Sequence, residues 1–188
     1  SGGVLSHAPR RAQAARMLVD AFMPTGITQL AVDSIFMMPQ LGVLVNIDKK
    51  DLKENARKAA VEVFKKDCLI RLGTCIAPVG KSKLGKTILT LELKLPDGNA
   101  IKHELKSGEL IRIDAEYEPM KAILTPARNM DIGAGKGETI NTKIYGGQVG
   151  ILFDGRGRPL ELPENDNERI AKLQEWSKVV NEYPDFKD

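Results

Sequence analysis

Apolar residues recur at three- and four-residue spacing near the start of the chain, which is the pattern of a helix with one buried face. The apolar positions at this spacing are Ala14, Met17, Leu18, Ala21 and Phe22. Pro9 suits a first helical turn, and Pro24 and Gly26 end the pattern. We therefore predict a helix over residues 6–22, followed by a short strand, "ITQLAV", over residues 27–32.

A nearly unbroken apolar run, "IFMMPQLGVLVNI", comes next at residues 35–47. Asp33 or Ser34 is suited to cap a helix that begins here. Because this second helix is apolar on nearly every side, we expect it to be buried. We also expect a kink at Pro39 and close packing against a neighbour at Gly42.

The rest of the chain changes from helical to strand-like patterning and back. Residues 48–67 predict an amphipathic helix with a solvated Lys and Glu face. Residues 68–163 contain short strands separated by turn residues, and this spacing predicts a small antiparallel barrel or sandwich. Residues 164–183 predict a closing amphipathic helix. Its apolar positions are Ile170, Leu173, Trp176 and Val180.

The clearest alternation lies in "TILTLELKL", residues 87–95. Leucines occupy one face of this strand: Leu89, Leu91, Leu93 and Leu95. Ile88, Thr90, Glu92 and Lys94 occupy the other face. Together with the helices at both ends, these strands place the chain in the α+β class.

Composition excludes several classes of function. The 188 residues include 28 Lys and Arg against 25 Asp and Glu, and a net charge of +3 is too small to indicate nucleic acid or a membrane surface as partner. An aromatic content of 5% makes stacking platforms for single-stranded nucleic acid scarce. Because the sequence has neither a long apolar span nor a signal-peptide layout, we expect a cytoplasmic protein.

Cysteine and histidine are too few to build a metal site or a nucleophilic site. Cys68 and Cys75 have no flanking ligands, and we expect two reduced, partly buried thiols. His103 alternates with Ile101 and Leu105, which predicts an exposed position on a strand. With His7 as the only other histidine, no catalytic triad can be assembled.

Two glycine-rich segments are candidate sites. "DIGAGKG", residues 131–137, has the look of a phosphate loop but lacks the Gly-Lys-Ser/Thr ending, so a flexible turn is favoured over an anion-binding nest. "FDGRGRPLELP", residues 153–163, places Asp154, Arg156 and Arg158 on a turn. These three residues are candidates for contact with a partner protein, and the alternative is an exposed turn without a partner.

The N-terminal stretch "SGGVLSHAPRRAQAARMLVDAF" has two glycines directly before a predicted helix start. In actin-like and sugar-kinase-like ATPase domains, a strand ends in such a pair, the adenosine motif. A helix follows at once, and a short strand then leads to a final acidic-capped helix. Gly2-Gly3, the helix to Phe22, "QLAVD" and the helix from Ser34 resemble this order. Glycines let a backbone approach a nucleotide, and a helix N-terminus favours its negative groups.

Four longer strings make the resemblance more specific: "GGVLSHAPRRAQAARMLVDAF", "LAVDSIFMMPQLGVL", "CLIRLGTCIAPVG" and "ILFDGRGRPLELP". They look like the C-terminal part of the MutL/GlmL accessory proteins of glutamate mutase, a family distinct from the mismatch-repair protein that shares the MutL name. The resemblance extends over most of the chain. It implies a protein that uses ATP and Mg²⁺ to release damaged cobalamin from a cobalamin-dependent mutase.

The same resemblance assigns roles to the first residues. Gly2, Gly3 and Val4 become candidates for a wall of an adenine or ribose pocket, and His7 becomes a candidate nucleotide contact. The alternatives are a simple helix-entry loop or an expression-tag remnant for the glycines, and a capping or surface position for His7. In such domains the phosphate loops and catalytic carboxylates lie N-terminal to the adenosine motif. We therefore expect a C-terminal fragment that is not an enzyme by itself.

This interpretation divides the chain into four parts. Residues 1–47 would complete an actin-like ATPase lobe, 48–67 would connect, 68–163 would form a β-domain, and 164–188 would form a C-terminal helix and tail. The β-domain is the part expected to dock on the mutase. The alternative hypothesis is a stand-alone β-domain interaction module with no role in nucleotide binding.

Overall fold

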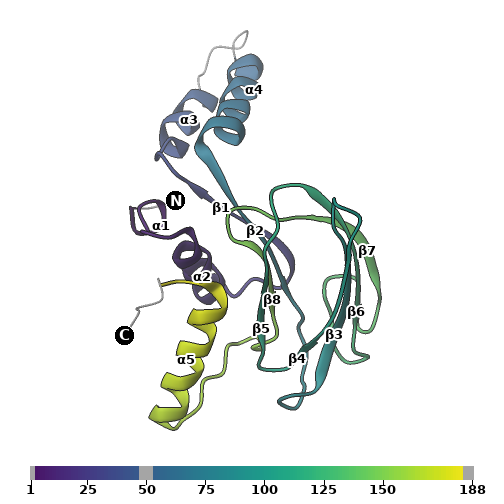
Figure 1. Cartoon of the computed structure of the whole chain (residues 1–188). Coiled ribbons are helices and arrows are strands. Elements are labelled where there is room, and N and C mark those ends of the chain that lie inside the picture. Colours follow the sequence, from purple (N-terminus) through teal and green to yellow (C-terminus); the bar gives the residue numbers. More distant parts are fainter. Residues whose placement is uncertain (1–2, 47–52, 184–188) are drawn as a thin grey trace.

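The structure, a computed structural model, describes residues 3–46 and 53–183. Its body has three layers, seen from left to right in Figure 1: a pair of helices, a four-stranded sheet and a second four-stranded sheet. A helical hairpin projects from one end of the first sheet. The chain is therefore α+β, as the sequence predicts.

The N-terminal helix is split in two. α1, Gly3–Ser6, is a single turn, and α2, Arg11–Phe22, begins five residues later. The prediction of one helix over residues 6–22 is wrong at its start because proline biases the residue before it away from helical geometry, and Pro9 lies in the break. α2 ends as predicted, at Met23, which adopts a left-handed conformation (φ 43°) ahead of Pro24.

The strand after α2 is confirmed as β1, Gly26–Asp33, but the next helix differs from its prediction. α3, Met38–Val45, starts with Pro39 in its first turn, where proline fits without a kink. The carboxylate of Asp33 accepts hydrogen bonds from the backbone N–H groups of Met37 and Met38, at 3.2 and 2.9 Å. Asp33 thus accepts hydrogen bonds from the helix start as predicted, but the helix begins later than expected and its N-cap position is Met37.

The expected burial of α3 is wrong. None of its residues is buried, and Val43 is 72% exposed. A side chain added at Gly42 would meet nothing within 4 Å, so the expected close packing there is also wrong. α3 pairs with α4, Lys53–Val63, in a hairpin that stands beyond the sheets (Figure 1). Apolar side chains of α3, among them Met38 and Val43, stay exposed there.

α4 continues into one π-helical turn, Phe64–Cys68, and then into β2, Leu69–Ala77. The amphipathic helix predicted from residue 48 is confirmed over residues 53–63. Its first residues, 48–52, lie outside the described part of the chain.

The first sheet has the order β1-β2-β8-β5, where β8 is Gly150–Asp154 and β5 is Leu110–Ile113. β2 and β8 are parallel, and the other pairs are antiparallel. The second sheet has the order β4-β3-β6-β7 and is antiparallel throughout. Its strands are Ala100–Lys106, Thr87–Lys94, Pro119–Pro126 and Ile140–Tyr145.

The two sheets face each other across an apolar core, so a sandwich is formed and the barrel alternative is wrong. Leu89, Leu91 and Leu93 of β3 are fully buried in this core, as the alternation predicts. Ile76 of β2 and Phe153 of β8 face them from the first sheet. The parallel pair β2–β8 departs from the expected antiparallel pattern.

The other face of the first sheet packs against α2 and the closing helix, α5, Asp166–Val180 (Figure 1). Ala15 and Val19 of α2, with Trp176 and Val180 of α5, belong to this second core. Asn165 caps α5 by accepting hydrogen bonds from two backbone N–H groups of its first turn. The apolar face predicted for α5 is confirmed only in part, since Ile170 is 52% exposed and Leu173 is 38% exposed.

The first sheet crosses the expected domain limits. β1 belongs to residues 1–47, yet it pairs along its whole length with β2 of residues 68–163, from Gly26 opposite Ala77 to Asp33 opposite Leu69. α2 packs on the same sheet. Residues 3–33 and the other strands of the first sheet therefore share one hydrophobic core.

Candidate functional site

An open groove of about 1010 Å³ runs between the N-terminal helices and the residues that follow α5. Gly3, Val4 and His7, three of the residues proposed to line a nucleotide pocket, lie on its wall. Gly2 lies outside the described residues. The groove therefore brings together every described member of the predicted nucleotide-contact set.

Two hydrogen bonds fix α1 against the body of the protein. The Ser6 hydroxyl donates to the backbone oxygen of Asp33 at 2.7 Å, and Arg11 Nη1 donates to the backbone oxygen of Ser6 at 2.9 Å. The imidazole of His7 lies 5.3 Å from the ring of Phe36, centroid to centroid. His7 itself is exposed, so it is available for a contact in the groove.

The groove has a largely apolar surface, and the polar side chains that line it are His7, Gln13, Arg16, Asp20, Glu182 and Tyr183. Val4, Pro9, Met17 and their small neighbours are suited to a flat ring, which fits a nucleobase better than it fits a phosphate chain. Asp20 and Glu182 also line the groove, and both pair with Arg16, which lines it as well.

The "DIGAGKG" segment does not offer its amides to a ligand. Asp131 Oδ1 accepts hydrogen bonds from Gly133 N at 2.6 Å and from Gly135 N at 3.1 Å. These bonds hold the pKa of Asp131 below its ordinary value. The nest that could have held an anion is filled by the protein's own carboxylate, in agreement with the prediction that a turn is favoured here.

The three charged residues of the "FDGRGRP" segment form ion pairs in the interior. Asp154 is fully buried, and the side chains of Arg156 and Arg158 are 1% and 6% exposed. Arg156 Nε and Nη2 each donate to Asp154 at 2.8 Å, and Arg158 Nη2 donates to it at 2.9 Å. An exposed turn is therefore wrong for these side chains, and we replace their expected partner contact by an intramolecular role.

This cluster includes partners that the sequence did not indicate. Arg156 Nη2 also donates to Asp20 of α2 at 2.7 Å, and Asp20 accepts from Arg16 Nε at 2.5 Å. Arg16 reaches Glu182, beyond α5, at 3.3 Å. The spacing of Arg16 and Asp20, four residues apart on one helix face, is the one local signal of this network.

Trp176 links the cluster to α5. The guanidinium carbons of Arg156 and Arg16 lie 4.9 and 5.6 Å from the centroid of its ring, within the range of a cation–π contact. We call the set Arg16, Asp20, Asp154, Arg156, Arg158, Trp176 and Glu182 the arginine–tryptophan cluster. It contains three guanidinium groups and three carboxylates, so its formal charges balance.

The cluster perturbs the titration of its members and of a nearby thiol. Burial acts to raise the pKa of Asp154, but hydrogen bonds and charge from Arg156 and Arg158 outweigh it and hold the pKa below its ordinary value. Burial, followed by the charge of Asp154, raises the pKa of Cys75 to about 12. Both cysteines are buried and unpaired, as predicted, and His103 is exposed, as predicted.

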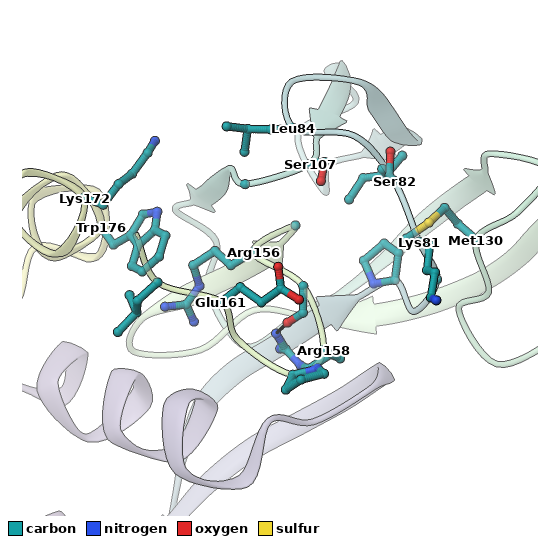
Figure 2. Close-up of a pocket in the computed structure, with 18 of the residues that line it drawn as sticks. Lys81, Ser82, Leu84, Ser107, Met130, Arg156, Arg158, Glu161, Lys172 and Trp176 are labelled. Carbon is teal, nitrogen blue, oxygen red and sulfur yellow. Dashed lines mark hydrogen bonds between the residues drawn. The ribbon is translucent and has the colours of Figure 1, made fainter. Parts of the chain in front are cut away.

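A second cavity, of about 640 Å³, lies beside the arginine–tryptophan cluster (Figure 2). Its walls come from the loop after β2, the turn between β4 and β5, the loop after β8, and α5. Two N–H donors of its lining residues, Arg156 Nη1 and Trp176 Nε1, are buried without a hydrogen-bond partner. Leaving such a donor unpaired disfavours the folded state by about 1–3 kcal/mol.

Comparison with protein-family models, curated proteins and solved structures found no match to this chain. Across residues 3–46 and 53–183, no helix is both long and apolar enough to cross a membrane. The same residues contain no group of three or more His, Cys, Asp or Glu side chains placed to hold a metal ion.

Proposed function

We propose that this chain is part of an ATP-binding accessory protein that reactivates a cobalamin-dependent mutase of the glutamate mutase type. The observation that carries the proposal is the position of Gly3, Val4 and His7 on one open, largely apolar groove. The sequence resemblance assigns these residues to the adenosine motif. The groove, in turn, suits a base and ribose. A cytoplasmic location belongs to the same proposal.

The chain would supply one wall of the nucleotide site. Its groove residues fit the base, whereas the phosphates and Mg²⁺ would be held by the rest of the ATPase domain. The uncovered apolar side of α3 supports this division, because Val43 is 72% exposed and Met38 is 46% exposed. Exposed apolar patches commonly mark surfaces that another protein segment covers. Magnesium-dependent ATP turnover by this chain alone would contradict the division.

For contact with the mutase, we propose the outer face of the second sheet. Lys94, Lys121 and Lys143 lie directly opposite one another across β3, β6 and β7. Like charges in this arrangement destabilise a sheet. An ion pair on this face joins Lys102 to Glu92 at 3.1 Å. Among the described residues, Lys94, Lys121 and Lys143 form no ion pair. The row would suit an acidic surface of the mutase.

The first experiment is isothermal titration of ATP and ADP, with Mg²⁺, into this chain and into the full-length protein that the proposal implies. A matched pair of variants of the full-length protein locates the site. A side chain added at Gly3 meets only Phe36, at 4.0 Å, so Gly3→Leu folds but crowds the groove. Ala100→Leu places the same side chain on exposed β4, outside the groove.

We expect Gly3→Leu to weaken nucleotide binding at least about tenfold, roughly 1.4 kcal/mol, and Ala100→Leu to leave it unchanged. Equal binding by both variants would remove the groove from the site. Absence of binding by the full-length protein would favour the alternative, a protein-interaction module without a nucleotide role. Lys121→Glu, tested for capture of the purified mutase, separates these two functions, because it leaves the groove intact.

A further inference from the structure

The cavity beside the arginine–tryptophan cluster has the composition of a ligand site. Apolar atoms form the larger part of its surface, and polar side chains from several segments stand around it (Figure 2). The apolar members are Pro78, Leu84, Ile88, Met130, Pro159, Leu162, Pro163 and Trp176. Its volume, about 640 Å³, is in the usual range for small-molecule pockets. It is separate from the groove at α1.

Trp176 provides an unused donor in this wall. The residue is 3% exposed, and its indole N–H has no hydrogen-bond partner. Buried indole N–H groups usually have one. In Figure 2 the indole nitrogen lies on the side of the ring toward Lys172 and Leu84, away from the Arg156 guanidinium. Because the donor is buried, a ligand would have to displace side chains around it, and the group that it lacks is a hydrogen-bond acceptor.

The charged side chains around the cavity indicate the charge of the ligand group that would accept this hydrogen bond. Arg156 and Arg158 are neutralised by Asp154 and Asp20, so the lysines set the balance. Lys172 and Lys81 stand on opposite sides of the cavity, with Glu161 between them (Figure 2). The ion pair of Lys172 with Glu175, at 2.8 Å, is on the surface and therefore weak. Two lysines against one carboxylate favour an anion.

We propose that this cavity binds a small organic oxyanion, a carboxylate or phosphate on an apolar body. The apolar body packs against the wall, and the oxyanion accepts the indole N–H of Trp176 and pairs with Lys172. This proposal does not depend on the nucleotide site. Glu161 opposes the ligand and limits its affinity.

Nuclear magnetic resonance of the intact chain tests the proposal, because the protein has a single tryptophan and hence one indole N–H signal. The probes are benzoate, phenyl phosphate and the cation benzamidine. We expect benzoate, phenyl phosphate or both to shift the indole signal saturably and to slow its exchange with water. The stronger of the two identifies the oxyanion. Benzamidine should leave the signal in place.

Three variants fix the assignment. Glu161→Gln removes the opposing charge from an exposed side chain and should tighten binding of the anion about threefold. Trp176→Phe keeps an aromatic ring, although a smaller one, and removes the N–H, and isothermal titration should show binding about tenfold weaker. Glu54→Gln, on α4 and away from the cavity, is the matched control for Glu161→Gln and should bind as the parent does.

Two results would overturn the proposal. One is the absence of a saturable shift with either anion. The other is that benzamidine binds as tightly as the anions do and that Glu161→Gln weakens the binding of benzamidine. Because Glu161 is exposed, this variant folds, and the sign of its effect decides the case even if Trp176→Phe proves unstable.

Discussion

Asp154 neutralises two arginines in the interior of the protein. Asp154→Asn keeps the shape of the side chain and leaves Arg156 and Arg158 short of a counter-charge. We expect a loss of about 3–5 kcal/mol in the free energy of unfolding, measured by urea denaturation. Asp114→Asn is the control: Asp114 also pairs with an arginine, but its side chain is 84% exposed, and a change of about 0–1 kcal/mol is expected. Similar small losses for both would mean that the buried pair is not stabilising.

The same carboxylate gives stability a dependence on pH. Its pKa in the folded protein is lower than the unfolded value of about 3.9, because the two arginines outweigh the effect of burial. The stabilisation is therefore fully present above about pH 4 and is lost as the pH falls through the folded-state pKa. We expect urea midpoints measured between pH 7 and 2 to fall below pH 4 in the parent. Asp154→Asn should show a shallower acid loss, and parallel curves would contradict this.

At the scale of elements, glycine has opposite roles in the first sheet and in α3. At Gly73 of β2 (φ 144°), an added side chain would lie 1.7 Å from the backbone oxygen of Gly150 on β8. Gly42 of α3 faces open space. We expect Gly73→Ala to disrupt the parallel β2–β8 pair and to abolish cooperative thermal unfolding. Gly42→Ala should stabilise the protein by roughly 0.5–1 kcal/mol, because glycine is the poorer helix former.

Gly42→Ala also tests the position of α3, in the same thermal unfolding measurement followed by circular dichroism. If the helix were covered by a neighbour at Gly42, the added methyl group would collide with it and destabilise the protein. Destabilisation by Gly42→Ala would therefore contradict the conclusion that α3 is not covered at this position.

The sequence predicted the positions of helices and strands better than it predicted which segments cover them. Alternation identified the buried face of β3, and the apolar positions of α5 included the two residues that are buried, Trp176 and Val180. Both patterns are local. The apolar sequence of α3 predicted burial, but burial depends on which segments cover a helix. The break at residues 7–10 was missed because proline is also favoured in a first helical turn.

The candidate sites were harder to predict, because their contacts join residues that are far apart in the sequence. A turn with charged residues after a strand is usually solvated, so Asp154 and Arg156 were assigned to the surface. Arg156 is buried because Asp20 meets it from 136 residues away. No local pattern indicates such a pairing. Gly3, Val4 and His7 are close in sequence, and their common groove was for that reason easier to anticipate.

At the scale of the whole molecule, α5 and the hairpin of α3 and α4 contribute differently to the stability of the fold. α5 completes the core on one face of the first sheet, and Trp176 in it contacts two buried arginines. We expect a chain that ends at residue 163 to lose cooperative thermal unfolding, followed by circular dichroism. Replacing residues 34–68 by Asn-Gly should preserve it, because a two-residue turn of this type joins antiparallel strands. If the chain without α5 unfolded cooperatively and the chain without the hairpin did not, the layered arrangement of the core would be contradicted.

The antiparallel pairing of β1 and β2 bears on how this protein can change over evolution. Asp33 and Leu69 face each other where the two strands leave the sheet, so the segment between them is an excursion out of a hairpin. Its gain, loss or exchange leaves the strand order intact. Relatives of this chain can therefore carry grafts of very different size at this point, and a designer can use the same junction to splice in a foreign domain.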